Sequence, residues 1–98
     1  MIKLSYHMAA QQDVVRLVEF LIETDIETAL ETVAIIENGV SLLVKHPQIG
    51  RPTETKHLRE LVISRGSTGY VALYEFDELL ELVIVLRVKH QREADFYD

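Results

Sequence analysis

Basic side chains and a histidine gather near the end of the chain, and their types could do chemistry. Three cations and one histidine fall within six residues there: Arg87, Lys89, His90 and Arg92. Arg65 precedes them in the same half of the sequence. A guanidinium binds phosphate or carboxylate through two parallel hydrogen bonds, and histidine transfers protons near neutral pH. This set could therefore hold an RNA backbone and stabilise the negative charge that develops on the phosphate when a 2′-OH attacks it. It could equally bind an acidic partner protein.

Acidic residues close in sequence give a second interpretation of the same set. They are Glu54, Glu60, Glu93 and Asp95. Pairing with them would turn the cations into a solvated rim of surface ion pairs that binds no ligand. Residue types alone leave both interpretations open.

Other patterns of catalytic or ligand-binding residues are absent from the sequence. The chain has no cysteine, which excludes disulfides and thiolate metal sites. Its four histidines lack metal-ligand spacing, and no serine stands in a Gly-x-Ser-x-Gly elbow. Gly66 and Gly69 should join two strands rather than open a helix, so they do not predict a phosphate-binding loop. We expect neither a metal nor another cofactor.

The elements that must position the basic residues are three apolar runs in the second half of the chain. Val, Ile, Leu and Tyr dominate Leu58–Ile63, Tyr70–Phe76 and Leu80–Val88, and glycine or acidic residues separate these runs. They predict an antiparallel three-strand meander that brings Arg65 and the end of the last strand to related ends of the domain. Residues Leu82–Leu86 show no polar alternation, which predicts a central strand buried on both faces.

The first half of the chain predicts a short strand and two helices. Alternation over Ile2–Tyr6 indicates a strand that pairs with an edge of the meander, and helical periodicity follows from Met8 to Thr24. Asp25 is placed to cap a second helix over Ile26–Lys45, which the short connection makes antiparallel to the first. The apolar stripe of that second helix is Ile26, Ala29, Leu30, Val33, Ile36, Val40 and Leu43. Gly39 within it indicates close backbone contact or a slight bend.

Length and charge limit the classes of function. The 98 residues predict a single domain over 1–98, with a net charge of −6. No signal peptide and no apolar run of about 20 residues is present, so we expect a cytoplasmic protein that does not span a membrane. The acidic balance disfavours nonspecific binding to nucleic acid, although seven of the ten Lys and Arg residues lie between positions 48 and 98.

Four segments, taken in order, resemble the RelE/ParE toxin family of prokaryotic toxin–antitoxin and plasmid-stabilisation modules. The segments are His46–Pro52, Leu58–Ile63, Ser67–Tyr74 and Arg87–Ala94, and they follow the predicted strand and helical hairpin. The resemblance implies a small α+β fold in which the hairpin packs on the antiparallel sheet. It also implies a toxin that is neutralised by a cognate antitoxin, whose segment docks on exposed apolar positions of the hairpin or sheet edge. The chain has no helix-turn-helix of its own, so we expect no direct sequence-specific DNA binding.

The family divides by target, and its two branches imply different roles for the basic residues. RelE-like members cut mRNA at the ribosome, which would make Arg65, His90, Arg92 and Tyr97 catalytic. ParE-like members are not enzymes and inhibit DNA gyrase. The target- or antitoxin-binding residues would then be Arg59, Arg65, Arg87, Lys89, His90, Arg92 and Phe96.

The ParE-like branch is favoured by three features of the sequence. The predicted helices are long, the net charge is acidic, and Phe96 lacks the hydroxyl that some RelE proteins carry at the matching position. RelE-like ribonuclease activity is the alternative. A third hypothesis is a family member that only binds an antitoxin.

Overall fold

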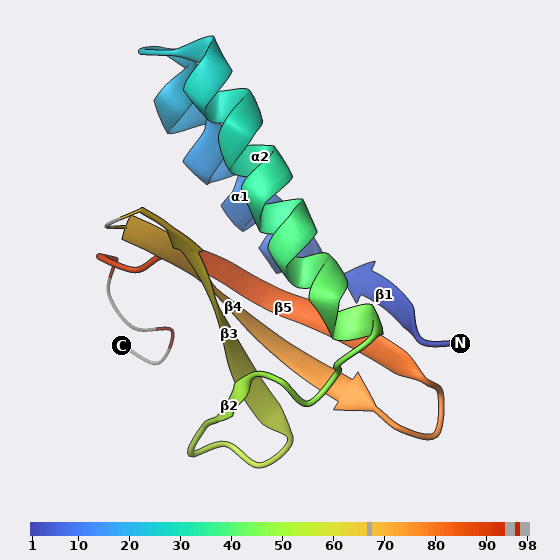
Figure 1. The fold of residues 1–98 in the computed structure, drawn as a ribbon. Coiled ribbons are helices and arrows are strands. Elements are labelled where there is room, and N and C mark those ends of the chain that lie inside the picture. The colour runs from blue at the N-terminus through green and yellow to red at the C-terminus, as the bar shows by residue number, and fades with distance from the viewer. Residues whose placement is uncertain (67, 94–95, 97–98) are drawn as a thin grey trace.

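The computed structural model describes residues 1–66, 68–93 and 96, with the backbone alone for Arg65 and Thr68. Figure 1 shows two helices lying across a curved sheet. In chain order the elements are β1 (Lys3–Tyr6), α1 (Met8–Ile22), α2 (Ile26–Ser41), the 3₁₀ turn η1 (Leu42–Val44), β2 (Arg51–Pro52), β3 (Leu58–Arg65), β4 (Thr68–Asp77) and β5 (Leu82–His90).

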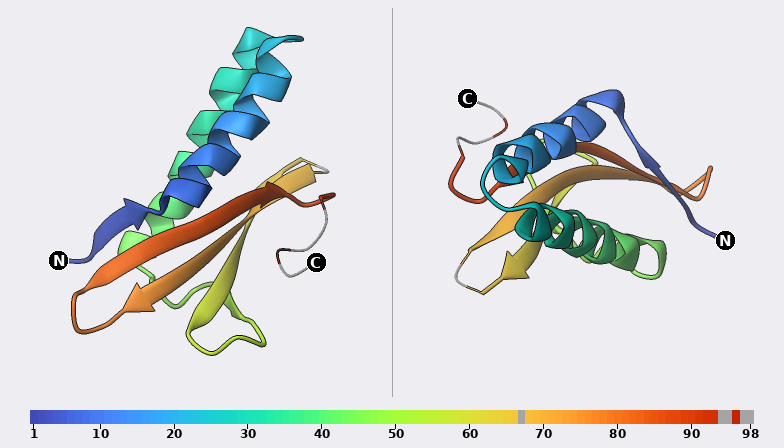
Figure 2. Two further views of the ribbon diagram at one scale, coloured as in Figure 1. Left: turned by 180° about the vertical axis from the view of Figure 1, so that it is seen from behind. Right: turned by 90° about the horizontal axis from the view of Figure 1, so that it is seen from above.

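The sheet has the strand order β1-β5-β4-β3-β2. The first strand runs parallel to β5, and every other neighbouring pair is antiparallel. The helical hairpin packs on one face of the sheet, and its end with the α1–α2 connection projects beyond the strands (Figures 1 and 2). Of the residues described, no helix is long and apolar enough to cross a membrane.

The predicted α+β fold is confirmed, with one strand more than expected. The meander and the N-terminal strand are present, and β1 pairs with the edge of the meander as predicted. The additional strand is β2, where Arg51 and Pro52 pair with Glu60 and Arg59. Two residues are too short to show an alternating pattern, so this segment was expected only as a turn-rich connection.

Local capping explains where the helices begin. The Asp25 carboxylate accepts hydrogen bonds from the backbone N–H groups of Glu27 (3.0 Å) and Thr28 (3.3 Å), which confirms the predicted cap of α2. The prediction that this helix continues to Lys45 is wrong. α2 ends at Ser41, and the chain tightens into the 3₁₀ turn before Pro47.

The buried face of α2 differs from the predicted stripe at its N-terminal end. The side chains that reach the core are Ala29, Thr32, Ile36, Val40 and, in η1, Leu43. Ile26 and Leu30 were expected there but are 62% and 66% exposed. The first turns of α2 lie in the part of the hairpin that projects beyond the sheet (Figure 2). Ala29 in the same turns is buried, so Ile26 and Leu30 lie on the side of these turns that neither α1 nor a strand covers.

The strand β5 was expected to be buried on both faces, and this prediction is wrong. Val83, Val85 and Val88 are fully buried in the core shared with the helices, whereas Leu82, Ile84 and Leu86 are half-buried. A bulge opposite Leu73 and Tyr74 inserts one extra residue into β5, which lets both Val85 and Val88 face the core. The apolar run therefore reflects a strand paired on both edges, with one face only partly covered.

Candidate functional site

The sheet register brings one end of β5 next to the β3–β4 hairpin. Tyr70 pairs with His90, and the backbone N–H of Gln91 donates to the carbonyl oxygen of Gly69 at 2.9 Å. In the same hairpin the backbone of Arg65 pairs with Thr68. The backbones of Arg65 and of the segment after His90 therefore share one end of the sheet.

His90 is held by contacts on two sides. Its ring meets Tyr70 edge to face, with 5.5 Å between the ring centres. Its Nδ1 accepts a hydrogen bond from the backbone N–H of Arg92 at 3.1 Å, which leaves the proton of the neutral ring on Nε2. The Tyr70 hydroxyl in turn donates to Oγ1 of Thr32 inside the core (3.4 Å).

Arg87 is neutralised by a buried carboxylate that the sequence analysis did not single out. Asp13 of α1 is only 5% exposed. Its Oδ2 lies 2.7 Å from Arg87 Nε, its Oδ1 lies 3.1 Å from a second guanidinium nitrogen, and Oδ2 also accepts the backbone N–H of Val88 at 2.9 Å. Burial acts to raise the pKa of the Asp13 carboxyl, but these hydrogen bonds and the charges of Arg87 and Arg16 outweigh it and lower the pKa.

A second ion pair joins α1 to the segment after β5. Arg16 lies 2.8 Å from Glu93 and 3.6 Å from Asp13. The hydrogen bond to Glu93 raises the pKa of Arg16, and the hydrogen bond to Asp13 raises that of Arg87. One of the two interpretations of the sequence paired Glu93 and Glu60 with the cations of the basic set. Instead Glu93 pairs with Arg16 of α1, and Glu60 pairs with Arg51 at 3.2 Å.

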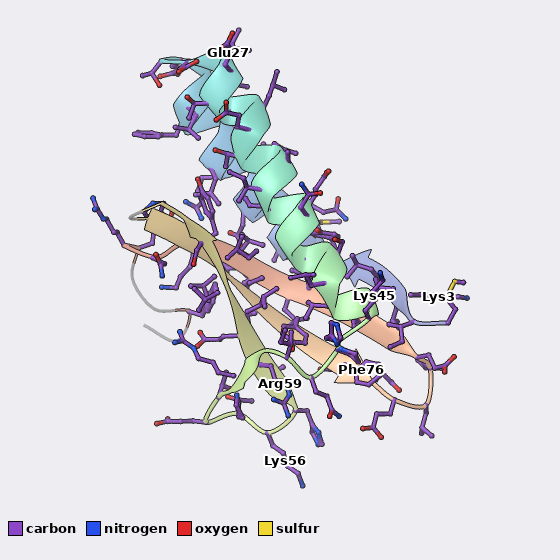
Figure 3. All side chains as sticks on the ribbon, viewed as in Figure 1. Lys3, Glu27, Lys45, Lys56, Arg59 and Phe76 are labelled. Carbon is purple, nitrogen blue, oxygen red and sulfur yellow. The ribbon has the colours of Figure 1, made fainter. Side chains whose placement is uncertain are left out.

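The remaining basic residues do not converge on one site. Lys89 donates to the carbonyl oxygen of Glu93 (3.1 Å) and lies 5.5 Å from the ring centre of the half-buried Phe96. Arg59 donates to the carbonyl oxygens of Gln48 (3.2 Å) and Gly50 (2.8 Å). Figure 3 shows Arg59 near β2, far from the end of the hairpin that Glu27 marks.

Arg92 differs from the other cations at this end of the sheet. It is exposed, and the described part of the chain offers its guanidinium no acid partner. Tyr97 lies outside the described residues, as does the Arg65 side chain. Nothing in the described part of the chain brings three potential metal ligands together.

A pocket of about 600 Å³ separates the hairpin from this end of the sheet. Its lining is mainly apolar and aromatic, from Leu17, Phe20, Leu21 and Tyr70. Arg16, His90, Arg92 and Glu93 also line it. Of the two arginines in this wall, Arg16 is paired with Glu93, whereas Arg92 has no acid partner in the described part of the chain.

Sequence reasoning missed Asp13, although one signal was present. Asp13 lies three residues after Ala10 and four before Leu17, on the inward face of the first helix. An acid at such a position needs a partner, because a buried unpaired charge is costly. Its partner is 74 residues away, so the sequence did not indicate which cation it would be.

Comparison with known proteins places this arrangement in a family. A family model described as the ParE toxin of the type II toxin–antitoxin system parDE matches residues 4–95. The chain belongs to the ParE toxin family. The resemblance to RelE/ParE toxins is thereby confirmed, and this ParE-family chain is a toxin of the type II toxin–antitoxin class.

The similar proteins include both ParE and RelE toxins. The ParE-family chain is 27% identical over 84 residues to toxin RelE3 of Caulobacter vibrioides, covering 86% of this chain and 88% of that protein. It shares its fold with the chromosomal ParDE toxin–antitoxin system of P. aeruginosa (TM-score 0.76, 24% identity, 91% and 95% of the two chains covered). It also matches the RelBE2 toxin–antitoxin complex of Mycobacterium tuberculosis, with a TM-score of 0.61, 20% identity, and 94% of this chain and 93% of that chain covered. The match to the isolated E. coli RelE toxin has a TM-score of 0.64 and 15% identity, and covers 99% of this chain and 92% of that chain.

Proposed function

We propose that this ParE-family toxin inhibits DNA gyrase by binding it as a protein ligand, without cleaving RNA. The ion pairs of Asp13 with Arg87 and of Arg16 with Glu93 carry the proposal. A ribonuclease needs cations free to hold the phosphate and stabilise its developing charge. At this end of the sheet two arginines are instead neutralised by the chain's own carboxylates.

The length and exposure of the helical hairpin support a protein target or partner. The two helices have 15 and 16 residues, or about 23 Å each. The projecting end exposes Phe20 (77%), Ile26 (62%) and Leu30 (66%). Ile26 and Leu30 lie one turn apart on the same side of α2, and neighbouring exposed apolar side chains are typical of a protein-binding surface.

We further propose that a cognate antitoxin neutralises the toxin by covering this projecting end. The ParDE and RelBE2 systems named above each pair a toxin with an antitoxin. An antitoxin segment that folds on binding could lay its apolar face against Phe20, Ile26 and Leu30. The resulting assembly is a hetero-oligomer.

A RelE-like ribosome-dependent mRNA endoribonuclease is the second candidate. The exposed Arg92 next to His90 favours it. A guanidinium can bind the phosphate of a phosphodiester, and an imidazole can transfer a proton during its cleavage. Arg65, His90, Arg92 and Tyr97 would then be the catalytic residues. The similarity to toxin RelE3 is compatible with this activity.

A supercoiling assay tests the proposed function. Purified toxin is added to DNA gyrase, ATP and relaxed plasmid, with and without the antitoxin, and the same toxin stock is added to a coupled translation reaction. The proposal expects loss of supercoiling or trapped cleaved DNA, relief by antitoxin, and intact mRNA. Normal supercoiling at high toxin excess, together with mRNA cut at A-site codons, would establish the ribonuclease instead.

A further inference from the structure

We propose that Asp13 is a positioning residue, which fixes the segment from Val88 to Glu93 against α1 so that His90 and Arg92 can meet the target. The inference rests on the proposed function, because it assumes that this segment contacts the protein that the toxin inhibits. Asp13 itself is buried and does not touch the target.

The first argument is the place of Asp13 at the edge of the sheet. The strand β1 pairs with β5 only as far as Val85. Three residues later the backbone N–H of Val88 donates to Asp13 Oδ2 at 2.9 Å. A helix side chain therefore supplies the acceptor where the neighbouring strand has ended, and a buried N–H without an acceptor would be costly.

The second argument is that α1 holds the segment at both of its ends. Asp13 binds Arg87 and Val88 where the segment begins, and Arg16, one turn further along α1, binds Glu93 where it finishes. The two anchors differ in strength. Asp13 is buried and makes three hydrogen bonds, whereas Arg16 and Glu93 are partly exposed and their pair is screened by water.

The third argument is what lies between the anchors. The His90 ring packs on Tyr70, and its Nδ1 accepts a hydrogen bond from the backbone N–H of Arg92. The position of the His90 ring therefore sets where Arg92 lies. The pairing of β5 with β4 continues to His90 and does not depend on Asp13. If the Asp13 anchor is lost, only the weaker Arg16–Glu93 pair still ties the segment to α1, and the His90 side chain can shift against Tyr70. The consequence is a misplaced Arg92 in a protein that otherwise keeps its fold.

The test compares Asp13→Asn with Glu19→Gln. Glu19 is an exposed acid on the same helix that makes no ion pair among the residues described. The toxin–gyrase supercoiling assay gives the potency per folded molecule, with the folded fraction measured by circular dichroism. Magnetisation transfer between the His90 and Tyr70 rings is measured by NMR.

We expect Asp13→Asn to lower potency per folded molecule by about tenfold, the scale of one lost interface anchor, and to weaken the ring contact. Glu19→Gln should match the wild type in both readouts. Asp13→Glu, which keeps the charge, should recover part of the potency. If Asp13→Asn does not fold, Arg87→Lys is tested instead. This change keeps the Asp13 carboxylate as the acceptor for the Val88 N–H but removes the two-point contact between Asp13 and the guanidinium.

Two outcomes separate the positioning role from the proposed function. Asp13→Asn with wild-type potency per folded molecule and an intact ring contact would overturn the positioning role, even if its melting temperature fell. A wild-type toxin that spares gyrase would overturn the proposed function. In that case the same variants would be compared by their ability to arrest translation. The positioning role predicts that Asp13→Asn is again weaker than the wild type, and equal potency of the two would refute it.

Discussion

The backbone N–H of Gly50 donates a 2.9 Å hydrogen bond to the Tyr74 hydroxyl oxygen, and this bond joins residues 24 positions apart in the core. Tyr74 is fully buried in β4, and burial raises the pKa of its hydroxyl, so the group stays neutral. A Cβ atom on Gly50 would lie 2.6 Å from the Tyr74 ring and 2.9 Å from the Glu60 carbonyl oxygen. Glycine thus lets the connection before β2 close over the tyrosine.

Substitutions on either side of this bond should destabilise the fold. Gly50→Ala should lower the free energy of unfolding by about 2 kcal/mol, because the added methyl overpacks the site. Tyr74→Phe should lower it by about 1 to 3 kcal/mol, because the Gly50 N–H loses its acceptor in the core. Urea denaturation measures both. Tyr6→Phe is the control, since the described residues give its hydroxyl no hydrogen bond, and a comparable loss there would contradict the role of the bond.

Acid should remove the stability that the Asp13 ion pair provides. The pKa of Asp13 is lower in the folded state than its ordinary value of 3.8, so the unfolded chain takes up a proton more readily as pH falls. The contribution is complete above the ordinary pKa and is lost as pH falls through the folded value. The difference in unfolding free energy between wild type and Asp13→Asn should therefore be large at pH 7 and shrink below about pH 4.

At pH 7 Asp13→Asn should cost about 2 kcal/mol, because the contacts to Arg87 and Val88 are weakened without an equal replacement. Urea denaturation across the pH range measures it. Glu19→Gln should show no such dependence. A cost for Asp13→Asn that is constant from pH 7 to pH 3 would rule out this linkage.

Gly39 opposes Ile63, and alanine at this position sets two effects against each other. Alanine favours a helix by about 1 kcal/mol over glycine, but its Cβ would lie 2.8 to 3.0 Å from three side-chain atoms of Ile63. Overpacking costs about 1 to 3 kcal/mol, so Gly39→Ala should be net destabilising by about 1 kcal/mol in urea denaturation. Ala34→Gly on the exposed side of α2 isolates the helix effect alone. A stabilised Gly39→Ala variant would show that Ile63 moves aside freely.

The projecting end of the hairpin should carry the antitoxin contact. Replacing Phe20 and Leu30 by serine removes apolar surface that is already exposed, so the fold should keep its melting temperature. Affinity for the antitoxin, measured by calorimetry, should fall at least tenfold, the scale expected of about 1.4 kcal/mol of lost contact. The control is the Leu79→Ser and Leu80→Ser pair in the β4–β5 turn, with exposures of 97% and 67%. Equal losses in both double variants would place the contact elsewhere.

Changes at the end of the chain should separate the two candidate targets. Tyr97→Phe should leave toxicity unchanged if the toxin binds gyrase, because binding does not require a general acid or base. Arg92→Glu or Lys89→Glu should reduce toxicity by reversing charge on the contacting segment. Colony counts after induction, at matched soluble expression, measure both. A Tyr97→Phe variant that stays as toxic as the wild type would count against the ribonuclease, and a non-toxic variant would support it.

The strands of the meander were predictable because their apolar runs and turn residues are local signals. The structure places them at Leu58–Arg65, Thr68–Asp77 and Leu82–His90, within about two residues of the predicted ends. The Asp25 cap is local in the same way. The limits of the buried stripe on α2 were not predictable, since Ile26 and Leu30 have the right spacing but no strand beneath them.

The sequence by itself determined the fold class and the family resemblance. Periodicity, helix caps and each short motif can be identified from residues that are close together in the sequence. Only the tertiary structure decided what the basic residues do. Whether Arg87 is a free cation depends on Asp13, 74 residues earlier, and the place of Arg59 depends on carbonyl groups of the connection before β2. An ion pair forms only where the charged atoms lie within about 4 Å of each other, and exposed charges more than about 10 Å apart are largely screened by salt. The role of each charge is therefore set by neighbours that folding alone brings together.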